Sequence, residues 1–244
     1  MNTIIGNQAK FDAVLSKLSE GPIPRLVCPK DVGAYYYGSK KMGQGEKQLR
    51  PTKDHLIRLA RHLAGCQKSS DVLERQCLFG LHGVDKQEIA LARAEYMIER
   101  IYTDERTTVP RAWYVFEGNT CPDFYIEGDN YIILGEGKWR EGNITLTTSF
   151  LNNGEQRCQM VRHIQAALNA TDKTVYAFYI VDDNCSYKED LTKKALAEQL
   201  GKESIPLSEL DQKKILNAFY GYTTWQAIEE LGIGVSFLSV DQIK

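Results

Sequence analysis

Two short apolar runs separated by a turn form the strongest pattern in the chain. Phe124–Glu127 (FYIE) and residues 131–134 (YIIL) are rich in aromatic and β-branched residues, and Gly-Asp-Asn lies between them. This pattern predicts a β-hairpin. The second run has no polar alternation, so we expect a central strand that is covered on both faces. Residues 135–138 (GEGK) are polar, and the strand should end there.

Apolar spacing predicts further elements on both sides of the hairpin. Residues 86–102 and 155–169 have helical periodicity, and residues 111–117 and 174–181 have the composition of strands. Residues 143–148 are expected to extend the second hairpin strand. The other predicted helices are residues 9–18, 51–65, 71–81, 191–200, 208–220 and 223–231, and a last strand-like segment is residues 235–240.

The order of these elements predicts the fold class. From residue 86 to residue 185 the order is helix, three strands, helix, strand, which predicts an α/β core with a mixed central sheet. Residues 1–85 and 186–244 are then helical N- and C-terminal extensions. The alternative is that all three segments form one compact unit.

Polar side chains gather where the hairpin ends. The alternation of side chains in a strand places Glu136 and Lys138 on the same face. If the hairpin loop holds two or four residues, the residue numbers of two paired residues, one from each strand, add up to 259. Asp123 then lies opposite Glu136. Their Cβ atoms would then be roughly 5 Å apart. A three-residue loop would shift the register by one.

A pair of neighbouring carboxylates favours a bound cation. Two such charges about 4 Å apart repel by roughly 4 kcal/mol at an effective dielectric of 20. An all-oxygen site suits Mg²⁺, or Mn²⁺ in its place, and the Gly137 carbonyl could add an oxygen ligand. Lys138, on the same face, could orient an attacking water or offset phosphate charge. That combination fits metal-assisted phosphodiester hydrolysis.

The motif that these residues form resembles a known family. Pro122-Asp123, twelve residues and then Glu136-Gly137-Lys138 resembles the PD-(D/E)XK nuclease superfamily, which includes restriction endonucleases. The resemblance covers about residues 86–183 and implies a restriction-endonuclease-like core. It also implies that Asp123 and Glu136 bind the metal and that Lys138 is the catalytic lysine. A surface hairpin that ends in a solvated Glu–Lys pair is the alternative.

Helices on either side of the hairpin offer further candidates. The resemblance implies that the preceding helix can add an acidic residue, here Glu95 or Glu99, although a solvated acidic face is the alternative. On the following helix the polar positions are Gln159, Arg162 and His163. Gln159 or Arg162 could approach a bound phosphate, and capping or solvent exposure is the alternative.

Charge is unevenly distributed along a chain whose net charge is −2. Residues 30–62 hold eight Lys and Arg against three Asp and Glu, so a DNA-contacting surface is expected on the N-terminal side. A solvated basic face is the alternative, and Tyr35 to Tyr37 could stack on bases or pack as a strand. The candidate DNA contacts are Lys40, Lys41, Lys53, Arg58 and Arg61.

We therefore expect a Mg²⁺-dependent endonuclease of restriction type that acts on double-stranded DNA. The alternatives are another nuclease of the same fold (for repair, structure-specific cleavage or defence, on DNA or RNA) and a non-catalytic nucleic-acid-binding module. Cleavage of both strands of a palindrome would favour a homodimer.

The remaining sequence features indicate the cellular compartment in which the protein is expected. The chain has no 18-residue apolar run and no basic-then-apolar N-terminus, so neither a membrane span nor a secretory signal is expected. Its six cysteines are far apart and include no Cys-x-x-Cys pair, which is typical of reduced thiols in a cytoplasmic protein.

Overall fold

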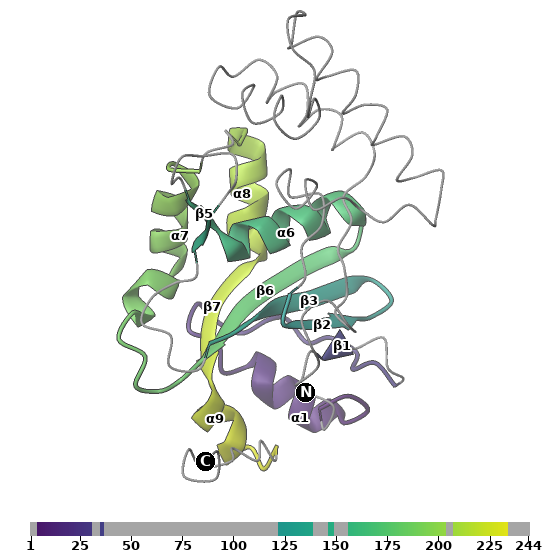
Figure 1. The fold of residues 1–244 in the computed structure, drawn as a ribbon. Coiled ribbons are helices and arrows are strands. Elements are labelled where there is room, and N and C mark those ends of the chain that lie inside the picture. Colours follow the sequence, from purple (N-terminus) through teal and green to yellow (C-terminus); the bar gives the residue numbers. More distant parts are fainter. Residues whose placement is uncertain are drawn as a thin grey trace, which may run out of the picture.

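A mixed five-stranded sheet lies at the centre of the fold (Figure 1). The computed structural model describes residues 4–30, 35–36, 122–138, 146–148, 156–203 and 207–233. The strand order is β1-β2-β3-β6-β7. These strands are β1 (Tyr35–Tyr36), β2 (Phe124–Glu127), β3 (Tyr131–Gly137), β6 (Thr174–Val181) and β7 (Phe219–Thr224). The predicted α/β class is confirmed.

The β2–β3 hairpin has the register that a two-residue turn sets. Phe124 pairs with Gly135 in an antiparallel ladder. Gly128 and Tyr131 lie on either side of the turn at residues 129–130, and the Gly128 N–H donates to the Tyr131 carbonyl at 3.0 Å. Of the two registers that the sequence left open, the one in which paired residue numbers add up to 259 is therefore the one observed.

The second hairpin strand is central, as its uninterrupted apolar run predicts. Residues 131–134 are at most 2% exposed. β3 lies between β2, which is antiparallel to it, and β6, which is parallel to it. The bounds of β6 are those predicted from the sequence. The crossover between β3 and β6 contains α6 (Gln159–Ala170), because parallel neighbours need a long connection.

The segment before α6 differs from the prediction. The helix begins at Gln159 because the three preceding residues form β5 (Gln156–Cys158). β5 pairs with β4 (Leu146–Thr148) in a separate two-stranded sheet. The expectation that residues 143–148 extend the hairpin strand in the main sheet is therefore wrong. The backbone groups of β4 are satisfied by β5 instead.

The C-terminal segment contributes a strand that the sequence analysis missed. Residues 208–220 and 223–231 were expected to be helical, but β7 (Phe219–Thr224) lies between α8 (Glu209–Ala218) and α9 (Trp225–Glu230). β7 pairs in parallel with β6. Its aromatic and β-branched residues favour a strand once an edge of a sheet is available.

Helices cover both faces of the sheet (Figure 1). One core cluster joins α6, α7 (Lys193–Leu200) and α8 to one face. The opposite face packs against α1 (Gln8–Leu15) and α9. A 3-10 helix, η1 (Lys188–Leu191), precedes α7. All three predicted segments of the chain therefore contribute to the same sheet and cores.

The N-terminal segment contributes an edge strand to the sheet. Tyr35 and Tyr36 form β1, which pairs with the outer edge of β2, so these two residues are in a strand as one of the two interpretations expected, and base stacking by the tyrosines remains a prediction. The predicted helices at residues 51–65, 71–81 and 86–102 lie outside the described residues, as do the predicted strands at residues 111–117 and 235–240. Within the described part of the chain, no helix has the length and apolar character needed to cross a membrane.

Gly221 provides a test of how β7 packs against the N-terminal segment. Its φ is +74°, and a Cβ built on it would lie 2.1 Å from Ser19 Oγ. We expect Gly221→Ala to lower the free energy of unfolding by about 2–3 kcal/mol, from backbone strain and this contact together. Urea denaturation measures the change.

Gly232→Ala is the matched control. Gly232 has a φ of +65°, but no atom lies within 4 Å of its added Cβ. That variant should therefore lose only about 1 kcal/mol, the cost of the left-handed backbone. Equal losses in the two variants would contradict the close packing of β7 on Ser19.

Candidate active site

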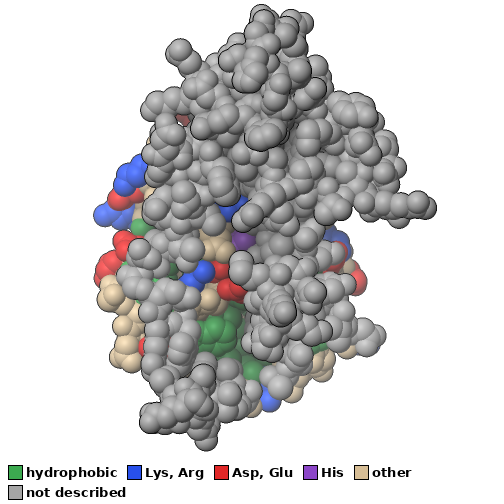
Figure 2. Space-filling model, in the orientation of Figure 1, with side chains coloured by type: hydrophobic (Ala, Val, Ile, Leu, Met, Phe, Trp, Pro, Cys, Tyr) green, Lys and Arg blue, Asp and Glu red, His purple; other side chains and the backbone are tan. Residues whose placement is uncertain are grey.

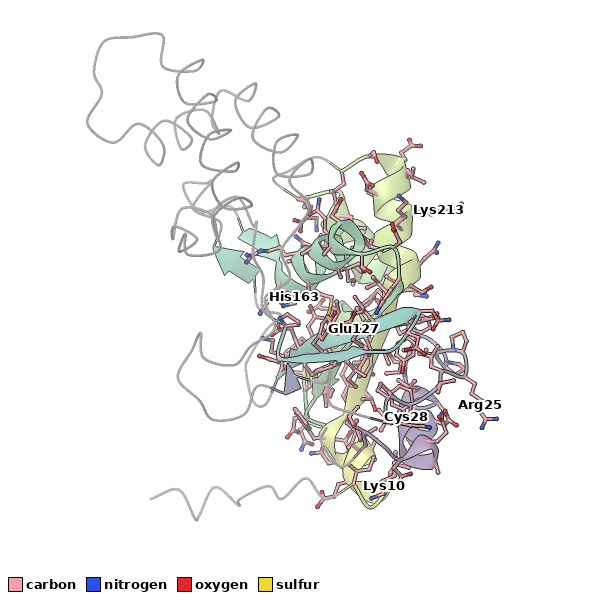
Figure 3. The ribbon with its side chains drawn as sticks, turned by 90° about the vertical axis from the view of Figure 1, so that its right-hand side faces the viewer. Lys10, Arg25, Cys28, Glu127, His163 and Lys213 are labelled. Atoms are coloured by element: carbon pink, nitrogen blue, oxygen red, sulfur yellow. The ribbon has the colours of Figure 1, made fainter. Side chains whose placement is uncertain are left out.

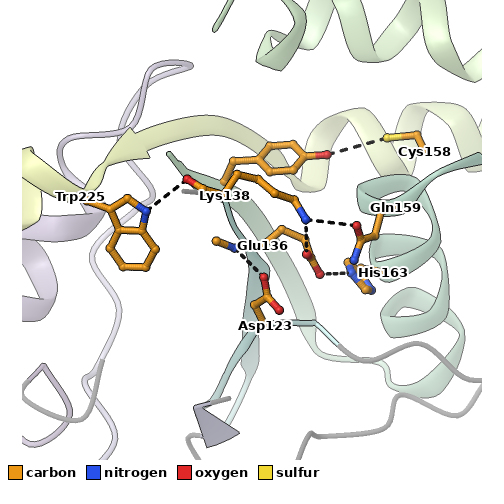
Figure 4. Close-up of polar contacts among 9 residues, drawn as sticks. Asp123, Glu136, Lys138, Cys158, Gln159, His163 and Trp225 are labelled. Atoms are coloured by element: carbon orange, nitrogen blue, oxygen red, sulfur yellow. Dashed lines mark hydrogen bonds and ion pairs between the residues drawn. The ribbon is translucent and has the colours of Figure 1, made fainter. Parts of the chain in front are cut away.

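Three polar residues meet at the carboxyl end of β3 (Figure 4). Asp123 immediately precedes β2, and the hairpin register puts it opposite Glu136. The Gly137 N–H donates a 2.9 Å hydrogen bond to Asp123 Oδ2. Lys138 Nζ lies 3.0 Å from Glu136 Oε2. The side chains that the sequence analysis singled out therefore lie together in space.

Glu136 is a buried charge that is held on both oxygens. Only 1% of it is exposed, and a lone carboxylate at such a position would be strongly unfavourable. Lys138 contacts Oε2, and His163 Nε2 lies 2.5 Å from Oε1. His163 is itself 1% exposed. The carboxylate is thus buried together with two side chains that bind both of its oxygens.

The helix α6 supplies two of the contacts. Gln159 and His163 are four residues apart, which puts them on one face of the helix, and α6 packs on the face of the sheet that carries Glu136. Lys138 Nζ donates to Gln159 Oε1 at 3.4 Å. Figure 3 shows His163 on the side of α6 that faces the sheet.

His163 is the residue whose role the sequence analysis missed. It was identified only as a polar position on the helix. The available signal was its place among residues that proved to be buried, including Met160, Val161, Ile164 and Ala167. A titratable residue on the buried face of a helix needs a buried partner.

The two carboxyl groups have opposite pKa shifts. Burial, followed by repulsion from Glu136, raises the pKa of Asp123 to about 7, although the Gly137 N–H opposes the change. Burial alone would also raise the pKa of Glu136. The charge and hydrogen bond of His163, and then those of Lys138, outweigh burial and lower the pKa of Glu136 to about 2. Near neutral pH the pair therefore carries one permanent and one titratable negative charge.

The main chain at the end of β3 is also held in place. The Lys138 N–H donates to the Ile180 carbonyl at 2.8 Å, which continues the pairing with β6. The Trp225 indole N–H donates to the Lys138 carbonyl at 3.3 Å. A Cβ on Gly137 would lie 3.0 Å from Trp225 Cζ2, so a side chain at this position would press on the indole.

The donor atoms fit a hard divalent cation. Asp123 and Glu136 offer carboxylate oxygens, which suit Mg²⁺ or Mn²⁺ better than softer metals. The described residues contain no group of three or more His, Cys, Asp and Glu side chains arranged to bind a metal. A cation held by the two carboxylates would therefore need further oxygens from the Gly137 carbonyl, water or substrate.

Side chains of both charges lie close together on one face of the molecule (Figure 2). Figure 2 shows acidic, basic and histidine side chains next to one another near the centre of one face.

The other predicted site residues lie outside the described residues; they are Glu95, Glu99, Lys40, Lys41, Lys53, Arg58 and Arg61. The expected additional acid and the expected DNA contacts therefore remain predictions.

Comparison with known proteins gives no relative: no family model, no curated protein and no solved structure matches the chain. The site must therefore be interpreted from its own geometry.

Replacing Asp123 should reveal the cost of its charge. The pKa of Asp123 is raised, so the folded state binds more protons than the unfolded state between about pH 4 and pH 7, and stability falls as the pH rises through that range. In EDTA at pH 8 we expect Asp123→Asn to be more stable than the wild type by about 1–2 kcal/mol. This estimate allows for solvent screening of a partly exposed side chain.

Urea denaturation across pH measures this effect, and the gain should vanish below pH 4. The matched control is Asp129→Asn at the exposed turn of the same hairpin. A stabilisation that is the same at every pH, or one that the control reproduces, would refute the assigned cause.

Replacing His163 tests the buried ion pair. We expect His163→Ala to lower the free energy of unfolding by about 3 kcal/mol at pH 7, because it leaves the Glu136 charge without one of its two partners. Combining it with Glu136→Gln should cost less than the sum of the single changes. Thermal and urea unfolding give these values. Additive losses would mean that His163 acts only by filling space.

Proposed function

We propose that this protein is a metal-dependent nuclease of the PD-(D/E)XK type that hydrolyses DNA phosphodiester bonds. The observation that carries the proposal is the arrangement of Asp123, Glu136 and Lys138 at the end of one strand. Apart from the separate β4–β5 pair, the order β2, β3, α6, β6, with an antiparallel and then a parallel pairing in the main sheet, also agrees with the restriction-endonuclease-like core that the motif implies.

The two carboxyl groups would hold the cation together with the Gly137 carbonyl. When bound, Mg²⁺ supplies Lewis-acid stabilisation of the phosphate and lowers the pKa of a water molecule. Asp123 gains most from a neighbouring cation, because its carboxylate form is disfavoured by burial and by Glu136. Glu136 is already ionised and fixed in orientation by His163, so its geometry is set in advance.

Lys138 supplies the positive charge of the site. Its ammonium group has three N–H donors. Among the described residues, Glu136 Oε2 and Gln159 Oε1 accept from it at 3.0 and 3.4 Å. A further N–H can point to a phosphate oxygen or to the attacking water.

Double-stranded DNA is the substrate that we favour, in a reaction of restriction type. This choice rests on the resemblance and on the basic N-terminal segment. A restriction enzyme that cuts a palindrome would act as a homodimer. A repair, structure-specific or defence nuclease, on DNA or RNA, would use the same catalytic residues.

One observation favours a second candidate, a nucleic-acid-binding module that keeps the scaffold without catalysis. Both oxygens of Glu136 are engaged by buried side chains, Lys138 and His163, as they would be in a purely structural polar network. The two candidates differ in whether Glu136 is needed for metal-dependent cleavage or only for stability.

Cleavage assays separate these candidates. With Mg²⁺ or Mn²⁺ we expect the wild type to cut duplex DNA, and Glu136→Gln and Lys138→Met to be at least about 100-fold slower. The first variant removes a carboxylate charge that would hold the metal, and the second removes the ammonium charge beside the reacting phosphate. Single-stranded, branched and RNA substrates in the same panel identify the preferred nucleic acid.

Glu127→Gln is the matched control. Glu127 lies at the other end of β2 and pairs with Lys173 at 2.7 Å. This variant should cut at the wild-type rate. A wild type that binds nucleic acid but cuts no member of the panel would favour the non-catalytic module. Unchanged cleavage in Glu136→Gln would exclude the proposed site.

A further inference from the structure

A residue from the C-terminal segment touches the main chain that carries the proposed catalytic lysine. Trp225 is the first residue of α9 and directly follows β7. Its indole N–H donates to the Lys138 carbonyl across a separation of 87 residues (Figure 4). The local sequence predicts a helical extension outside the core for this residue.

The contacts of Trp225 hold the end of β3 in two ways. The indole N–H binds the Lys138 carbonyl, while the Lys138 N–H binds the Ile180 carbonyl of β6. The ring of Trp225 lies against Gly137, where an added Cβ would be only 3.0 Å from Cζ2. The polypeptide is thus held by a hydrogen bond at Lys138 and by close packing at Gly137.

The geometry points to Trp225 as a positioning residue for the active site. It fixes the main chain from which the Lys138 amine and the Gly137 carbonyl project, and this role rests on the proposed function. A catalytic group must be held within about 0.5 Å of its productive position. Lys138 lies one residue beyond the end of β3, where the strand ladder alone gives less support.

Another contact of α9 provides a matched control. Gln226 Oε1 accepts a 3.1 Å hydrogen bond from the Asp183 N–H, which follows the end of β6. Trp225 and Gln226 are therefore neighbours on one helix that bind the ends of two different strands. If Trp225 only anchored α9, losing the Trp225 contact or the Gln226 contact should affect the site equally. If Trp225 positions the end of β3, only the loss of the Trp225 contact should affect the site.

The test compares Trp225→Phe with Gln226→Ala in the full-length chain. Phenylalanine keeps a ring beside Gly137 but removes the N–H donor. In a duplex-cleavage assay with Mg²⁺ we expect kcat to fall by about tenfold in Trp225→Phe with KM within about twofold of the wild type, since small displacements of a catalytic group have large effects. Gln226→Ala should change neither constant by more than about twofold.

Hydrogen exchange provides a readout that does not need activity. The Lys138 amide should exchange roughly fivefold faster in Trp225→Phe than in the wild type, and at the wild-type rate in Gln226→Ala. If the wild type cuts no substrate, the proposed function fails, and faster exchange confined to Trp225→Phe still supports the positioning of β3. Unchanged exchange and kcat in Trp225→Phe, or equal losses in both variants, would overturn the inference.

Discussion

The buried charge of Glu136 is the constraint on which the rest of the site depends. A carboxylate that is 1% exposed needs partners from other elements, and here they come from the end of its own strand and from α6. The face of α6 that packs its apolar residues on the sheet also carries Gln159 and His163, so the same packing delivers these partners to the site. The charge of Glu136 also affects Asp123. Burial, together with repulsion from Glu136, raises the pKa of Asp123, so the protonation of Asp123 can change near neutral pH.

The elements that could be predicted from the sequence are those whose determinants are local. The two apolar runs predicted the hairpin and left two registers open, of which the two-residue turn selects the observed one. The bounds of β6 followed from eight residues with no polar interruption at the centre. The same local reasoning brought Asp123, Glu136 and Lys138 together, because alternation and register alone determine which strand residues are neighbours.

What could not be predicted depends on contacts between distant parts of the chain. β7 has the composition of a strand but follows a helix without a break, and only the free edge of β6 decides its conformation. β4 is a strand because β5 satisfies its backbone groups, and β5 shortens the helix that was expected there. His163 and Trp225 joined the site only when the packing of α6 and α9 was known.

The long separation between β3 and Trp225 has a consequence for synthesis of the protein. Domains form as the chain leaves the ribosome, at about 5–20 residues per second. The hairpin emerges first, yet Lys138 meets the indole only after a further 87 residues have been made. A newly made chain can thus bring its acidic pair together as soon as the hairpin forms, but the main chain at Gly137 and Lys138 is held from the other side only once β7 and α9 have joined the sheet.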